Sequence, residues 1–168
     1  MRISLRALAT AENARIAFDY TIDLSKEEVC FAFPFPEPVR LSGIVQDNAG
    51  AVSLEGVIEA RVHMRCARCN SPVIYEKWVP VRFLLAKSVQ DEDKDDVFII
   101  EGDEVDPAEV LVPELILDME MAVLCREDCK GLCPKCGHDL NKGDCGCNRV
   151  EIDPRWESLR NFVEKNKE

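Results

Sequence analysis

Residues 52–85 read VSLEGVIEARVHMRCARCNSPVIYEKWVPVRFLL, and they predict the central hairpin of the fold. On each side of the cysteines, apolar residues recur at every second position, which is the period of a strand with one buried face. The two runs are separated by Cys66-Ala67-Arg68-Cys69-Asn70-Ser71 and then Pro72. We therefore expect a long β-hairpin whose tip carries Cys66 and Cys69.

Weaker strand signals lie on the N-terminal side of this hairpin. Alternation at residues 16–22 and the sequence of residues 39–46 predict two more strands, and Asp47-Asn48-Ala49-Gly50 is typical of a hairpin turn. The segment 31–38 contains three prolines, which exclude a regular central strand. Residues 97–101 are expected to form one more short strand.

Two helix starts follow the strands. Asp106-Pro107-Ala108-Glu109 has a capping acid, a first-turn proline and an acid at the third position, so we expect a helix at about 106–122, bent by Pro113. Asp153-Pro154 repeats this signal, and an apolar stripe follows it at Trp156, Leu159 and Val163. The chain is therefore expected to end in a second helix.

These elements predict an α+β fold. Residues 1–105 would form an antiparallel, curved or barrel-like sheet, followed by one main helix. A cysteine-rich, zinc-bound tail ending in a helix would complete the chain. The expected division is a β-rich domain at 1–124 and a zinc module with its helix at 125–168.

Charge is distributed unevenly along the 168 residues. The net charge is −11, and residues 125–168 carry nine bases and nine acids, so the whole excess of acid belongs to residues 1–124. An acidic body disfavours non-specific binding of nucleic acid, because phosphate contacts need concentrated Lys and Arg. The sequence shows no secretory signal and no apolar run of about 20 residues, so we expect a cytoplasmic protein.

Nine cysteines in a reducing compartment predict metal ligands or redox residues rather than disulfides. Cys133-Pro134-Lys135-Cys136-Gly137 is a tight turn that aims two sulfurs at one point, and Cys145-Gly146-Cys147 follows nine residues later. Zinc takes four such ligands in a tetrahedron. We therefore expect a structural zinc site on Cys133, Cys136, Cys145 and Cys147.

The remaining cysteines suggest a second site. Cys66 and Cys69 at the hairpin tip can be joined by Cys125 and Cys129 to make another set of four. The alternative is that Cys66 and Cys69 are free thiols at a turn. Cys30 lies between Val29 and Phe31 and is expected to be a small apolar residue of the core.

Other cysteine chemistry is less well supported. Redox dithiols sit at a helix N-terminus, whereas Cys66 and Cys69 lie in a β-turn. An iron–sulfur cluster on Cys125, Cys129, Cys133 and Cys136 stays open as an alternative. A zinc deaminase needs a His-x-Glu element, which neither His63 nor His138 supplies. Sites made only of thiolates are closed, so no catalytic residue and no enzyme activity are expected.

The cysteine pattern resembles that of the YceD family, the large ribosomal RNA subunit accumulation proteins. The resemblance rests on Cys66-Ala67-Arg68-Cys69, Cys129-Lys130-Gly131-Leu132-Cys133-Pro134-Lys135-Cys136-Gly137, Leu140-Asn141, Cys145-Gly146-Cys147 and Asp153-Pro154-Arg155, and it spans about residues 15–160. It implies a role in 23S ribosomal RNA accumulation or large-subunit assembly. It implies no catalytic residue.

The function expected from this resemblance is a non-enzymatic, zinc-binding factor for large-subunit biogenesis. Its partners would be ribosomal RNA or assembly proteins, with no DNA, membrane or small-molecule substrate. The alternatives are a zinc-ribbon adaptor for protein interactions unrelated to ribosomes and a thiol oxidoreductase. Direct RNA contact would fall on the bases of the tail, which are Arg126, Lys130, Lys135, Lys142, Arg149, Arg155 and Arg160.

Overall fold

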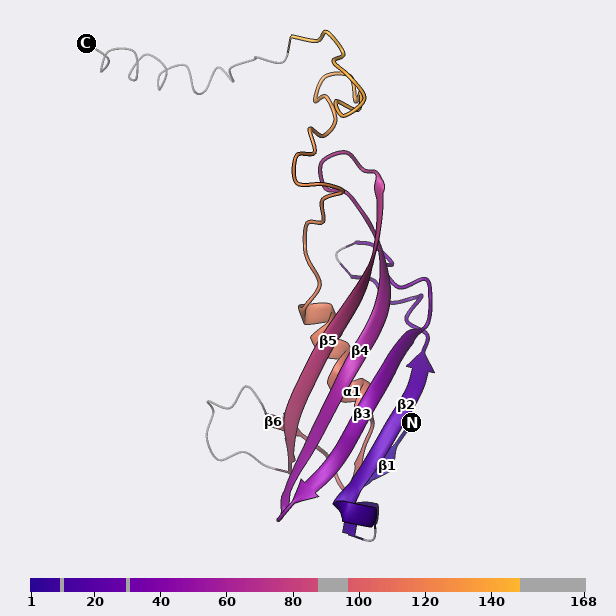
Figure 1. Cartoon of the computed structure of the whole chain (residues 1–168), viewed down its shortest axis with the longest axis vertical. Helices are drawn as coiled ribbons and strands as arrows, with labels where there is room; N and C mark the ends of the chain where they lie inside the picture. Colours follow the sequence, from indigo (N-terminus) through magenta and orange to yellow (C-terminus); the bar gives the residue numbers. More distant parts are fainter. Residues whose placement is uncertain (10, 30, 88–96, 149–168) are drawn as a thin grey trace, which may run out of the picture.

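The computed structural model describes residues 1–9, 11–29, 31–87 and 97–148. A five-stranded sheet in the order β2-β3-β4-β5-β6 dominates the fold, and β1 and β7 pair separately (Figure 1). The strands are β1 (Ile3–Ser4), β2 (Arg15–Ile22), β3 (Val39–Asn48), β4 (Ala51–Arg65), β5 (Pro72–Ala86), β6 (Val97–Ile99) and β7 (Glu104–Val105). Two short 3₁₀ turns, η1 (Leu5–Ala9) and η2 (Glu12–Ala14), precede β2.

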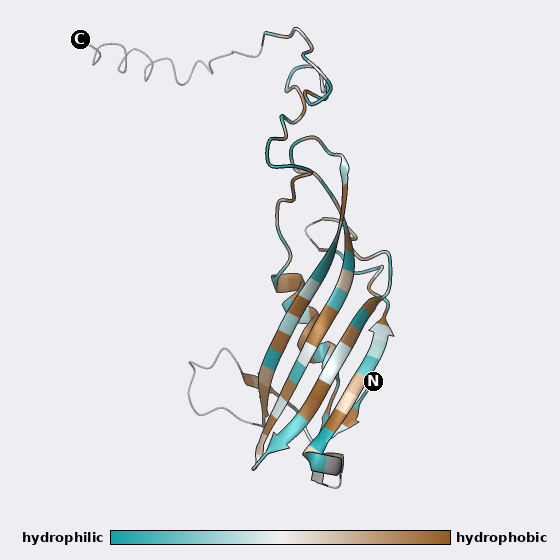
Figure 2. Cartoon of the chain, viewed as in Figure 1, coloured by the Kyte–Doolittle hydropathy of each residue, from teal (hydrophilic) through white to brown (hydrophobic). Residues whose placement is uncertain are grey.

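The β4–β5 hairpin forms as the sequence predicts. Its antiparallel register runs from Ser53 opposite Leu84 to Arg65 opposite Pro72. Apolar and polar residues alternate along both strands, as Figure 2 shows. One face therefore joins the core and the other stays exposed, with Trp78 62% exposed on it.

The β3–β4 connection confirms the predicted turn. Asn48 pairs with Ala51, which leaves Ala49 and Gly50 as the loop, with φ values of 54° and 93°. Two positive φ angles define a turn whose twist suits an antiparallel hairpin. The Gly50 N–H also donates to Asp47 Oδ1 over 2.7 Å, which fixes the turn.

The prediction of a purely antiparallel sheet is wrong at one edge. β6 runs parallel to β5, with Leu84 opposite Val97. Neighbouring antiparallel strands can be joined by two residues, whereas parallel strands need a longer crossover. Residues 87–96 separate these two strands, and that connection allows the parallel pairing.

The main helix, α1 (Pro107–Leu117), begins as predicted and ends earlier than expected. The Asp106 side chain accepts the Ala108 N–H over 3.0 Å, which caps the first turn. The extension to residue 122 is wrong because the next residues bind the sheet. Lys77 Nζ lies 3.0 Å from both Asp118 Oδ2 and Glu120 Oε1, so the chain after the helix is bound to β5.

The core lies between α1 and the concave face of the sheet, which curls around the helix as a half-barrel (Figure 1). Leu111 and Leu115 are fully buried there. Gly43 and Gly56 face each other on β3 and β4 and make room for the core side chains. A Cβ on Gly43 would lie 2.2 Å from Glu55 O, so no larger residue fits that position without a shift of the backbone.

The β4–β5 hairpin continues beyond this core, and its tip meets the chain that leaves α1 (Figure 1). No helix in the described part of the chain is long and apolar enough to cross a membrane. The expected C-terminal helix and Cys30 lie outside the described residues. The proposed division into domains at residue 124 stays a prediction.

Candidate metal centres

The hairpin tip is a tight turn that closes on its first cysteine. The Asn70 N–H donates to Cys66 O over 2.9 Å, and the Cys66 N–H donates to Ser71 O over 2.8 Å. Asn70 adopts φ 59°, a left-handed conformation that asparagine tolerates better than most residues. The local sequence thus holds Cys66 and Cys69 at the two ends of one short turn.

The same turn recurs in the tail. The Gly137 N–H donates to Cys133 O over 2.8 Å, and Gly137 has φ 72°. Gly137 follows Cys136 as Asn70 follows Cys69, so the two turns have the same backbone pattern. The predicted cysteine knuckle at residues 133–137 and the hairpin tip are therefore two copies of one local structure.

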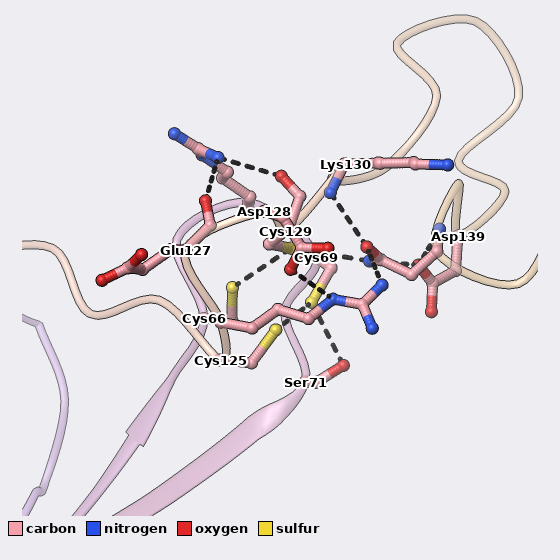
Figure 3. Close-up of polar contacts among 12 residues, drawn as sticks. Cys66, Cys69, Ser71, Cys125, Glu127, Asp128, Cys129, Lys130 and Asp139 are labelled. Atoms are coloured by element: carbon pink, nitrogen blue, oxygen red, sulfur yellow. Dashed lines mark hydrogen bonds and ion pairs between the residues drawn. The ribbon is translucent and has the colours of Figure 1, made fainter.

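The first cysteine group combines the hairpin tip with the chain after α1. Cys66 and Cys69 meet Cys125 and Cys129, with the four sulfurs within 4.8 Å of one another. Cys66 Sγ lies 3.8 Å from Cys129 Sγ, and Cys69 Sγ lies 3.5 Å from Cys125 Sγ. Figure 3 shows these side chains pointing toward a common centre. Cys66, Cys69 and Cys129 are buried, whereas Cys125 is exposed.

The second group lies wholly within the tail. Cys133 and Cys136 meet Cys145 and Cys147, again with sulfurs within 4.8 Å. Only Cys133 is buried. The structure therefore divides eight cysteines into the two sets of four that their pairing in the sequence predicts. Both groups consist of cysteine alone among the residues that the structure describes, so His63 and His138 belong to neither.

The electrostatics of the first group are unbalanced without a cation. Burial disfavours a charge on Cys66, but N–H groups of Cys125, Cys69 and Arg68 outweigh it and lower the pKa of the thiol to about 6. The Cys69 sulfur, burial and the Cys129 and Cys66 sulfurs act in the opposite direction on Cys125, and raise its pKa to about 12. The Cys66 thiol therefore ionises more readily than a free cysteine, and the Cys125 thiol ionises less readily.

The second group has the same asymmetry. N–H groups of Cys136 and Lys135 lower the pKa of Cys133 to about 6, despite its burial. Hydrogen bonding to the sulfurs of Cys136 and Cys145, with burial, raises the pKa of Cys147 to about 12. Four thiolates this close would need a positive ion between them to be stable together.

Backbone hydrogen bonds fasten the tail to the hairpin tip. The Ala67 N–H donates to Val123 O over 2.8 Å, and the Leu132 N–H donates to Arg68 O over 3.0 Å. Arg68 Nη1 donates to Cys129 O over 3.0 Å and to Glu127 O over 3.3 Å. Gly131 allows this close approach, since a Cβ there would lie 3.0 Å from Arg68 O.

Comparison with known proteins places this arrangement in a family. The family model described as large ribosomal RNA subunit accumulation protein YceD matches residues 54–163, which include the hairpin and both cysteine groups. The chain belongs to the YceD family. No solved structure matches it.

Several YceD-family relatives are themselves uncharacterised. A protein of Mycobacterium tuberculosis is 33% identical over 119 residues, covering 68% of this chain and 57% of the relative. YlbN of Bacillus subtilis is 26% identical over 133 residues, covering 78% and 77%. The Arabidopsis thaliana chloroplastic protein named large ribosomal RNA subunit accumulation protein YCED homolog 1 is 25% identical over 163 residues, covering 79% and 51%. The chain thus spans little more than half of the mycobacterial and plant relatives.

The donor set of each group in this YceD-family chain fits a tetrahedral thiophilic ion. A zinc ion bound to four thiolates at about 2.3 Å requires sulfurs roughly 3.8 Å apart. The two separations in the first group, 3.8 and 3.5 Å, are close to this value. The set proposed for an iron–sulfur cluster, Cys125, Cys129, Cys133 and Cys136, is split between the groups. A pair of closed, four-thiolate centres is the arrangement that the geometry supports.

Sequence reasoning missed the residues that surround the sulfurs. Asn70 could have been recognised, because it stands after the second cysteine of its turn, where Gly137 stands in the other. The Ser71 hydroxyl, 3.2 Å from Cys69 Sγ, lowers the pKa of that thiol. Arg68 and Asn141 have no local signal, since their contacts depend on how the tail folds onto the tip.

Proposed function

We propose that this YceD-family protein is a non-enzymatic zinc-binding factor that supports the accumulation of 23S ribosomal RNA and the biogenesis of the large ribosomal subunit. The observation that carries the proposal is the family match over residues 54–163, which contain all eight grouped cysteines. The name of the Arabidopsis relative supports the same role.

The chemistry of the centres supports a structural use of zinc. A zinc ion with four protein thiolates has no open position for water or substrate, unlike the three-ligand sites of zinc enzymes. Cys66, Cys69, Cys125 and Cys129 would join the hairpin tip to the tail, and the other four would hold the tail itself. Zinc in this arrangement shapes a surface and takes no part in a reaction.

The cysteine-rich tail is the part of the chain best suited to approach RNA. Residues 1–124 carry the whole net negative charge and repel phosphate, whereas the tail is balanced. Lys130 and Lys142 line one hollow of about 400 Å³ beside the second centre. Each thiolate-bound zinc adds negative charge, so isolated RNA affinity is expected to be weak. Of the other predicted bases, Arg149, Arg155 and Arg160 lie outside the described residues.

Depletion of the protein in cells tests the ribosomal role. The ratio of 23S to 16S ribosomal RNA should fall, large-subunit precursors should accumulate, and the protein should co-sediment with them. Wild type should restore the ratio, and a Cys66→Ser variant at equal abundance should not. An unchanged ratio, with no co-sedimentation, would overturn the proposal and leave the adaptor unrelated to ribosomes as the better reading.

Direct contact with RNA has its own test. Binding of wild type to 23S RNA fragments across a salt series is compared with that of a Lys130→Glu, Lys135→Glu, Lys142→Glu variant. Contact through the tail predicts binding that weakens steeply with salt and a shallower slope for the variant. If the variant binds RNA and restores 23S levels as well as wild type does, the tail is not the RNA-binding surface and a protein partner takes its place.

A further inference from the structure

Asn141 lies between the two cysteine groups and belongs to neither. Its amide oxygen accepts the Lys130 backbone N–H over 2.9 Å and Arg126 Nη2 over 2.7 Å. Its amide nitrogen lies 3.5 Å from Cys129 Sγ and 2.8 Å from Asp139 Oδ1. Every donor and acceptor of the amide therefore has a partner, and this fixes which end of the amide faces the sulfur.

The contact to Cys129 crosses from one group to the other. Cys129 belongs to the first group, whereas Asn141 lies in the loop between Cys136 and Cys145 of the second. A short ladder holds that loop in place, because the Leu140 N–H donates to Gly131 O over 3.0 Å and the Cys133 N–H donates to His138 O over 2.8 Å. Figure 3 labels Lys130 and Asp139, both of which are hydrogen-bonded to Asn141.

We propose that Asn141 is a positioning residue that holds the Cys129 thiolate for the first metal ion and couples the loading of the two centres. An N–H donor to a metal-bound thiolate orients the sulfur and withdraws some of its charge, and such outer contacts govern how tightly metal is held. Because the donor is held by the loop of the second centre, ordering that centre also prepares the first, and the coupling acts equally in both directions. The inference depends on the metal in the proposed function and not on the ribosomal role.

Replacement of Asn141 by aspartate tests the amide nitrogen separately from the amide oxygen. Asn141→Asp keeps an oxygen for Lys130 N–H and Arg126, so these two contacts that shape the loop are retained. The same change removes the donor to Cys129 and sets a carboxylate against the thiolate and Asp139. A second variant, Asp139→Asn with Asn141→Asp, returns an amide next to the new carboxylate and relieves that repulsion, but Cys129 still lacks its donor. Asn48→Asp, in the distant β3–β4 turn, is the control for added charge.

The measurements are zinc release to a chelator and ¹¹³Cd NMR of the cadmium-loaded full-length chain. Wild type should release two zinc ions slowly, and Asn48→Asp should match it. Asn141→Asp and the double variant should both lose the first-centre ion about 10–100-fold faster, which is the usual effect of losing an outer contact. The cadmium signal coupled to Cys66 and Cys69 should shift in both variants, and the sheet should keep its thermal transition.

Wild-type release rates and an unshifted first-centre signal in both Asn141 variants would overturn the positioning role alone. Release restored by the double variant would show that repulsion from Asp139, and not the lost donor, caused the defect, which also overturns the role. Wild-type protein that binds neither zinc nor cadmium would overturn the metal in the proposed function together with this inference. The two failures are therefore distinguishable.

Discussion

Loss of one ligand at the hairpin tip should release the tail from the sheet. In Cys66→Ser, the first centre retains three thiolates and a hydroxyl that is a poor zinc ligand. The cysteines of this centre are 56 and 63 positions apart in sequence, and they bring the hairpin tip together with the chain after α1. We expect the chain from about residue 123 onward to separate from the hairpin while the sheet stays folded.

The magnitude follows from the contacts that would remain. Four hydrogen bonds join the tip to residues 123–132, from Ala67, Leu132 and two from Arg68. At a net value of roughly 1 kcal/mol each they supply about 4 kcal/mol. Ordering about ten residues costs roughly 10–20 kcal/mol of backbone entropy. The difference is similar to the contribution of a structural zinc ion, which is on the order of 10 kcal/mol. We therefore expect the attachment to require the metal.

Limited trypsin digestion measures this release. Cleavage after Arg126 and Lys130 should be at least about 100-fold faster in Cys66→Ser, which corresponds to about 3 kcal/mol in the population of the open form. Cys133→Ser is the matched control, since it removes a ligand of the second centre and leaves the first complete. Cleavage after Lys135 and Lys142 should rise most in this variant. Cleavage after Arg126 should rise less than in Cys66→Ser, because all four ligands of the first centre remain and only the contact of Asn141 with Cys129 is loosened. Equal cleavage after Arg126 in wild type and Cys66→Ser would refute the attachment through the first centre.

Three further predictions concern metal content, packing and pH. Metal analysis of protein purified without added metal should give two zinc ions per chain, and iron with visible absorbance would contradict the zinc assignment. Gly43→Ala should lower the free energy of unfolding by about 2 kcal/mol or more in denaturant titration. The new Cβ would lie 2.2 Å from the backbone of Glu55 and 2.7 Å from that of Gly56. Gly56→Ala, whose Cβ would have its nearest contact at 3.1 Å, should lower the free energy of unfolding by less. The Tyr75 hydroxyl donates to Glu120 over 2.6 Å and, with Lys77, holds the pKa of Glu120 below its ordinary 4.5. The lowered pKa stabilises the fold above pH 4.5, and this stabilisation is lost as the pH falls below that value. Glu120→Gln should therefore lose less stability than wild type when the pH is lowered from 5 to 3. Equal losses in the two proteins would contradict the role of Glu120.

The parts of this fold that could be predicted are those governed by local rules. Period-two alternation placed the β4–β5 hairpin, and the Asp106-Pro107 signal placed the start of α1, because both depend on residues close in sequence. The path of the chain at the end of α1 depends on Lys77, which lies thirty positions before the first residue of the helix. Lys77 reaches Asp118 only after the sheet has formed. The parallel β6 likewise depends on where a long connection returns, which no local pattern determines.

The ligands of the candidate centres could be predicted from the sequence, as the hairpin and the start of the helix could. The pairing of cysteines in the sequence predicted both sets of four. A tight turn must bring its two sulfurs together, and four such pairs can be combined into two groups in only a few ways. The supporting contacts were not predictable, since Arg68 and Asn141 reach their partners across 61 and 12 residues. Residue type alone gives no sign of such roles.

The proposed metal would also explain why a hairpin can extend so far from its core. Val62 is fully buried in the main core, but beyond it Met64 and Val73 are only partly covered. The next buried cluster is Cys66, Cys69 and Cys129, with Leu124 packed against it. Three cysteines and two apolar neighbours are too few for a hydrophobic core, and small units of this kind depend on a metal or a cross-link. The sheet can therefore fold from its own apolar residues, whereas the shape of the tail, which carries the bases proposed to approach RNA, would depend on the metal ions proposed for the two cysteine groups.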